Sequence, residues 1–160
     1  MEIKDEKVVR LLSELFLKKT ESPDWAVKVL ERGFDSRSLR MLASMKTFDS
    51  PVEKDDFLGR SLRELNWDKI NINECLLSYS RIIAKDIIED RLDPIEGAQE
   101  IYTIVTTLNY PSELQGWNMI DEGIWGFKRF LETGKTSYFF NTKKQLDSEI
   151  LKLAKDLACS

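Results

Sequence analysis

The chain has 160 residues, of which 42% are hydrophobic and 32% are charged. This length and apolar content are enough for one core of ordinary size, so we expect a single helical domain over residues 1–160. The chain contains no histidine. That excludes Ser-His-Asp and Cys-His catalysis, and it excludes zinc sites that use histidine.

The charge balance is mildly acidic, with 24 basic and 28 acidic residues and a net charge of −4. Residues 1–50 are close to neutral, so the acidity lies in the C-terminal two-thirds. A protein that binds nucleic acid usually carries a basic face, and this composition does not favour such a partner.

The sequence patterns predict no targeting segment and no membrane segment. Its first residues are charged, no signal-peptide core follows them, and no apolar stretch is long enough to cross a membrane. The cysteines, Cys75 and Cys159, stand in no metal-binding or redox spacing. We therefore expect a cytoplasmic protein that does not associate with membranes.

Apolar residues recur at helical spacing along most of the chain. A first helix is expected over residues 8–16. A second begins at Ser22, where the serine can cap the helix and Pro23 can take the first helical position, and it stops at Gly33. A third begins at Ser36.

Three more helices follow in the middle of the chain. The fourth comes after the turn signal at residues 49–51, and the fifth carries apolar residues from Ile72 to Ile87. The sixth begins with Asp93 as its cap and Pro94 in its first turn, and it ends before Pro111.

The seventh helix carries apolar residues on one face and stops at Gly134, and a capping-box pattern at residues 142–145 begins the eighth. The apolar face of the seventh helix consists of Ile120, Ile124, Phe127 and Leu131. Because the connections are short, neighbouring helices should pack together. We predict an all-α fold, an irregular single-domain bundle of about eight helices.

Two patterns suggest alternatives to a purely structural role. Residues 22–46 have the outline of a helix-turn-helix, with Arg37 and Arg40 early on the second helix. Val29 stands where that motif usually has a small residue, and the surrounding charge is close to neutral. DNA binding is therefore kept as one alternative function.

The second pattern is a series of carboxylates around the junction of the fifth and sixth helices: Asp86, Glu89, Asp90 and Glu96. Paired carboxylates on two antiparallel helices can hold Mg²⁺ for pyrophosphate cleavage, as in all-α nucleotide pyrophosphatases. The usual Glu-Glu-x-x-Glu and Glu-x-x-Asp phrases of those enzymes are missing from the chain. A Mg²⁺-dependent nucleotide pyrophosphatase is therefore the other alternative function.

The late part of the chain is rich in aromatic residues, and most of these should be buried because their rings contribute the largest apolar areas. The apolar face of the seventh helix leaves Trp125 pointing elsewhere. We predict that Trp125 and the aromatic loop over residues 138–140, which includes Tyr138 and Phe139, form an exposed partner-binding patch. Asp121, Glu122 and Glu132 would lie at its rim.

The phrases over residues 35–43 and 93–102, and the layout between about Ser22 and Trp117, are similar to those of a loose group of small uncharacterised bacterial all-α proteins. Some small acidic helical bacterial proteins of this kind are immunity proteins, which neutralise a toxin by binding it. The missing catalytic groups, the mild negative charge and the late aromatic cluster predict a non-enzymatic protein-binding module, and by analogy the resemblance implies an immunity or adaptor protein. With it we expect a protein partner, no catalytic residues and no cofactor.

Overall fold

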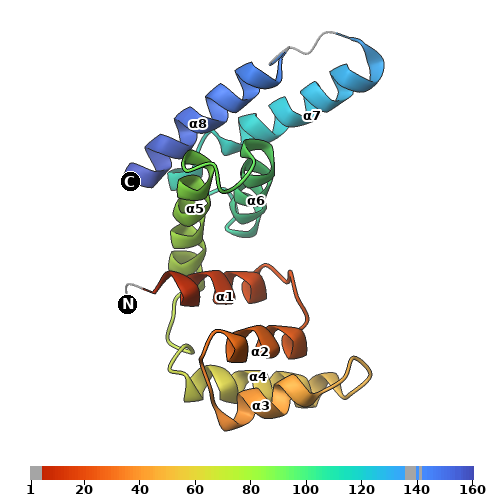
Figure 1. Ribbon diagram of the computed structural model, residues 1–160, viewed down its shortest axis with the longest axis vertical. Coiled ribbons are helices and arrows are strands. Elements are labelled where there is room, and N and C mark those ends of the chain that lie inside the picture. The colour runs from red at the N-terminus through yellow and green to blue at the C-terminus, as the bar shows by residue number, and fades with distance from the viewer. Residues whose placement is uncertain (1–4, 136–139, 141) are drawn as a thin grey trace. The chain divides into compact units, whose positions relative to one another are not determined.

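The computed structural model describes residues 5–135, 140 and 142–160, and these residues contain eight α-helices, one short 3-10 helix and no strand (Figure 1). The prediction of an all-α chain with about eight helices is confirmed. None of the helices in this described part has the length and apolar character needed to cross a membrane. The elements are α1 (Glu6–Phe16), α2 (Ser22–Glu31), α3 (Arg37–Ser44), α4 (Pro51–Glu64), α5 (Ile72–Ile88), α6 (Pro94–Thr107), η1 (Ser112–Leu114), α7 (Trp117–Thr133) and α8 (Lys143–Cys159).

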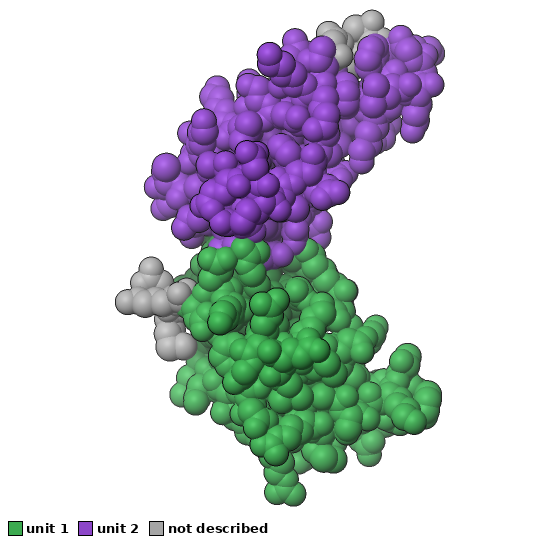
Figure 2. Space-filling view, in the orientation of Figure 1, with its two compact units in different colours: residues 1–78 green, residues 79–160 purple. Residues whose placement is uncertain are grey.

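The chain divides into two compact units, unit 1 over residues 1–78 and unit 2 over residues 79–160 (Figure 2). The division falls inside α5, so each unit includes part of that helix. The expectation of one domain over residues 1–160 stays a prediction, and the units are described separately.

Unit 1 is organised around α2, which packs against α1, α3 and α4. The indole nitrogen of the fully buried Trp25 donates a hydrogen bond of 2.7 Å to the backbone carbonyl of Leu11 in α1. The ring of Trp67 packs edge to face against the rings of Trp25 and Phe34, with centroid separations of 6.3 Å and 4.9 Å. An aromatic cluster therefore fixes α2 to its neighbours.

Unit 2 is built from α6, α7 and α8, each of which packs against the other two (Figure 1). Gly97 in α6 allows a close approach to α5, because a Cβ atom at this position would lie 2.6 Å from side-chain atoms of the buried Ile87. Gly123 in α7 has the same role toward the ring of Phe140, which a Cβ atom would meet at 2.4 Å. Both glycines are therefore required by packing inside a helix, where glycine is otherwise unfavourable.

Most of the predicted helix ends are confirmed by the backbone. The side chains of Ser36, Asp93 and Thr142 each accept a hydrogen bond from a backbone N–H in the first turn of the helix that follows. Gly33 and Gly134 take left-handed conformations just beyond α2 and α7, with φ of 91° and 67°.

One predicted cap is wrong. Helix α2 begins at Ser22, and the capping position belongs to Glu21, whose side chain makes no capping hydrogen bond. Pro23 is in the first turn as predicted, and proline has no N–H that a cap would need to satisfy. The start of α2 therefore depends on proline geometry rather than on a serine cap.

Candidate protein-binding surface

Trp125 lies on the outer face of α7 with 62% of its surface exposed. Ile120, Ile124 and Phe127 of the same helix are buried in unit 2. At 100° per residue these three side chains leave Trp125 on the opposite side. The prediction that Trp125 points away from the core is therefore confirmed, and its part in partner binding remains to be tested.

Leu131 departs from the prediction for the buried face of α7, because it is 66% exposed. The helical spacing does place Leu131 on the side of Ile124 and Phe127. However, the buried residues of α7 end at Phe127, and Leu131 lies in the last turn before Gly134. Helix α7 extends past its contacts with the core. Leu131 is therefore exposed although the helical period places it on the buried side.

Asp121 and Glu122 precede Trp125 by one helical turn and share its face. Asp121 is half-buried and Glu122 is exposed. Burial raises the pKa of the Asp121 carboxyl above its usual range; Lys128 opposes the rise and Glu122 adds to it. The predicted acidic rim therefore lies beside Trp125.

Two tyrosines that the sequence did not single out lie next to this acidic pair. A hydrogen bond joins the side chains of Tyr102 in α6 and Tyr110, and it raises the pKa of Tyr102. Burial and the charges of Tyr110, Asp121 and Glu122 raise this pKa further. The charges of Asp121 and Glu122 reach Tyr102 because α6 packs against α7.

Tyr110 is 58% exposed and has a left-handed backbone with φ of 61°. A bulky residue rarely adopts this conformation, because its Cβ crowds the neighbouring carbonyl group. Its N–H donates to the carbonyl of Val105, a hydrogen bond that closes the end of α6. The turn therefore fixes the backbone at Tyr110 and leaves its ring at the surface.

We name these five residues, Tyr102, Tyr110, Asp121, Glu122 and Trp125, the aromatic–acidic surface. The surface offers three aromatic rings, two phenolic hydroxyls and two carboxylates. The guanidinium of Arg129 lies over the Trp125 ring at 5.3 Å from its centroid, so a cation already stacks at the edge of this surface.

The sequence does contain a signal for the missed tyrosines. Residues 92–127 contain six carboxylates and no Lys or Arg, which gives a net charge of −6 where the whole chain carries −4. This segment comprises α6, η1 and most of α7. A search for stretches without basic residues would have drawn attention to Tyr102 and Tyr110.

The predicted aromatic loop is tested only in part. Tyr138 and Phe139 lie outside the described residues. Phe140 is half-buried, and its ring fills the space that Gly123 leaves open on α7. Phe140 therefore belongs to the packing of unit 2 rather than to an exposed patch.

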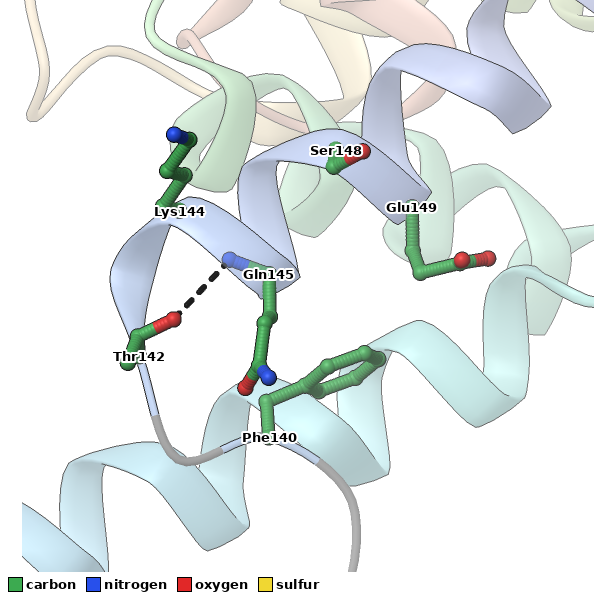
Figure 3. A pocket seen from close by; sticks show the side chains of 6 residues that line it. All are labelled: Phe140, Thr142, Lys144, Gln145, Ser148 and Glu149. Carbon is green, nitrogen blue, oxygen red and sulfur yellow. Dashed lines mark hydrogen bonds between the residues drawn. The ribbon is translucent and has the colours of Figure 1, made fainter.

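A hollow of about 440 Å³ lies at the start of α8, beside Phe140 (Figure 3). Thr142 lies at its edge and accepts a hydrogen bond of 3.2 Å from the N–H of Gln145, as the dashed line in Figure 3 shows. The described lining consists of Phe140, Thr142, Lys144, Gln145, Ser148 and Glu149. The hollow is thus formed mainly by the polar first turns of α8, apart from the aromatic–acidic surface.

The carboxylates proposed for a metal site are not arranged as that hypothesis requires. Helix α5 ends at Ile88, so Glu89 and Asp90 lie in the turn beyond it, with Asp90 in a left-handed conformation. Asp86 is 8% exposed and accepts hydrogen bonds from Arg91, which also pairs with Glu89.

Glu96 lies in the first turn of α6, where its backbone N–H donates to the side chain of the capping Asp93. Across residues 5–135, 140 and 142–160, no three acidic, histidine or cysteine side chains are grouped so that they could hold a metal ion. The structure therefore gives no support to the pyrophosphatase alternative.

The basic residues of the helix-turn-helix outline have acidic neighbours. Arg40 forms a bidentate ion pair with Asp35, with hydrogen bonds of 2.7 and 2.6 Å. The start of α3 is held by Glu64, whose carboxylate accepts hydrogen bonds from the backbone N–H and hydroxyl of Ser38. Arg37 is close enough to Glu64 to lower the pKa of that carboxyl, although the hydrogen bonds from Ser38 lower it more. This acidic surrounding gives the DNA-binding alternative no support.

Three comparisons with known proteins, against models of protein families, curated proteins and solved structures, find no match to this chain. The assignment of a function therefore rests on the residues and contacts of the chain itself.

Proposed function

We propose that this protein is a non-enzymatic binding protein that recognises a protein partner through the aromatic–acidic surface. The observation that carries the proposal is the exposure of Trp125 on α7, together with the similar exposure of Tyr110 at the end of the neighbouring α6. Tryptophan and tyrosine are the side chains most enriched at the energetic centres of protein interfaces.

The ordered backbone under these rings supports the same role. Trp125 projects from the middle of a helix, and the backbone N–H of Tyr110 closes the end of α6. A backbone that is already ordered loses less conformational freedom on binding, which favours affinity. The hydroxyls and carboxylates around the rings can supply the hydrogen bonds that a specific interface needs.

Within this role, we propose an immunity or adaptor protein that acts in the cytoplasm. An immunity protein needs a firm contact surface and no catalytic group, which agrees with a chain that contains no histidine. The buried thiol of Cys75 also fits a reducing compartment, because burial raises its pKa and keeps it protonated.

The test begins with a photo-activated phenylalanine analogue at position 125, expressed in the cells that make the protein. Irradiation should link the chain to one dominant protein, which mass spectrometry identifies. The same analogue at position 131 is the control, because Leu131 is equally exposed on the same helix but lies outside the aromatic–acidic surface.

The purified partner then allows a quantitative comparison. Trp125→Ala should weaken binding at least about thirtyfold, the effect of losing an interface anchor. Leu131→Ala should change it less than about twofold. Binding that is unaffected by Trp125→Ala, or cross-linking that is as strong from position 131, would remove the basis of the proposal.

A further inference from the structure

The charge around the aromatic–acidic surface is strongly one-sided. All six charged side chains in residues 92–127 are carboxylates, and the first basic residues after them are Lys128 and Arg129. Asp121 and Glu122 are two of these six, and they lie on the turn of α7 that precedes Trp125. The segment that carries the surface is therefore negative, and two of its charges lie within one helical turn of Trp125.

The carboxylates of Asp121 and Glu122 are not neutralised by ion pairs within the described part of the chain, where no Lys or Arg nitrogen lies within 4 Å of them. Other carboxylates of unit 2 have such partners: Asp86 pairs with Arg91, and Asp147 with Lys143. The charge that accompanies the exposed rings is thus available to an external cation.

The chain itself shows that the ring of Trp125 accepts a cation. Arg129 stacks over Trp125 at 5.3 Å, within the range of a cation–π contact. Tyr102 and Tyr110 supply two further rings from α6, which packs against α7, and from the turn that follows α6. A carboxylate next to an aromatic face binds a guanidinium or an ammonium group better than either feature alone.

We propose that the partner presents a basic contact surface, with an arginine or lysine side chain that binds at the carboxylates of Asp121 and Glu122, one helical turn before the exposed ring of Trp125. This inference rests on the proposed function, because it names the chemistry of the partner for the same surface. An acidic partner would meet the unpaired carboxylates of Asp121 and Glu122, and a purely apolar partner would bury them without a counter-charge, which is strongly unfavourable.

The first probe is a short synthetic peptide that alternates arginine and leucine, compared with a peptide that has glutamate at each arginine position. Binding is followed by NMR through the indole N–H of Trp125 and the backbone amides of Asp121 and Glu122. The arginine peptide should shift these signals and the glutamate peptide should not. The affinity of the arginine peptide should fall as salt is raised, because exposed charges are screened.

Matched variants separate a defined site from a general attraction to an acidic protein. Asp121→Asn with Glu122→Gln removes two charges from the aromatic–acidic surface, and Glu53→Gln with Asp55→Asn removes two exposed charges from α4 of unit 1. The first pair should weaken peptide binding at least about tenfold. The second should weaken it less than about threefold.

Two results would overturn the inference: equal weakening by both pairs of substitutions, or equal affinity for the arginine and glutamate peptides. Measurements with the cross-linked partner distinguish a failure of this inference from a failure of the proposed function. If Trp125→Ala weakens partner binding while Asp121→Asn with Glu122→Gln does not, the surface binds the partner. In that case the inference that the partner is basic is refuted. If Trp125→Ala has no effect either, the proposed function itself fails.

Discussion

The two units of this protein differ in the exposure of some of their aromatic residues and in the pairing of some of their charged residues. Unit 1 places its tryptophans inside, where Trp25 and Trp67 lie edge to face, and it disperses its charges in close ion pairs such as Glu14 with Lys28. Unit 2 leaves Trp125 and Tyr110 at the surface and gathers carboxylates beside them. Trp25 and Trp67 therefore contribute to the packing of unit 1, whereas Trp125 and Tyr110 of unit 2 remain accessible for binding.

The sharpest test of this contrast compares two tryptophans. Trp25→Ala should lower the free energy of unfolding by about 3–5 kcal/mol, because it removes a fully buried ring and its hydrogen bond to Leu11. Trp125→Ala should change this free energy by less than about 0.5 kcal/mol. Urea denaturation followed by circular dichroism measures both values, and similar losses for the two variants would contradict the contrast.

A second comparison uses glycines inside helices. Gly97→Ala should destabilise the protein by about 1–3 kcal/mol, because the new methyl group meets the buried Ile87 at 2.6 Å. Gly59→Ala in α4 meets no atom within 4 Å and should stabilise by about 0.5–1 kcal/mol through helix propensity. Thermal unfolding distinguishes the two, and a stabilising Gly97→Ala would show that α5 and α6 are packed less tightly than described.

The smallest expected effect concerns Asp121. Its pKa is raised in the folded state above the usual value of about 3.9, so the ionised carboxylate opposes folding at neutral pH. Asp121→Asn should therefore raise the free energy of unfolding at pH 7, by no more than about 0.5 kcal/mol because solvent screens this half-buried group. The gain should shrink as the pH falls through the raised pKa toward 3.9. A variant that is less stable at pH 7 would mean that Asp121 makes a favourable contact in the fold.

Local signals in the sequence predict much of the fold. Caps such as Asp93 and Thr142 act on the first turn of their own helix, and a glycine such as Gly134 ends a helix through its own backbone. These effects need no knowledge of distant residues. The exposed Leu131 shows the limit of such local signals. Whether this residue is buried depends on where the neighbouring helices end.

The candidate surface could be predicted only on α7. Trp125, Asp121 and Glu122 follow from the helical spacing of a single segment. Tyr102 and Tyr110 join them because α6 packs against α7, a tertiary contact that periodicity does not specify. The metal site expected around Asp86 is also predicted from helical spacing alone. In the structure α5 ends at Ile88, and the side chain of Arg91 donates a hydrogen bond to Asp86.

The most direct test of the central claim is hydroxyl-radical footprinting of the complex with the cross-linked partner. Trp125 and Tyr110 in unit 2 should become protected from oxidation when the partner binds. Phe48 in unit 1, which is 83% exposed, serves as an internal control and should react equally in the free and bound protein. Protection of Phe48 with unchanged oxidation of Trp125 and Tyr110 would place the binding site in unit 1 and contradict the account.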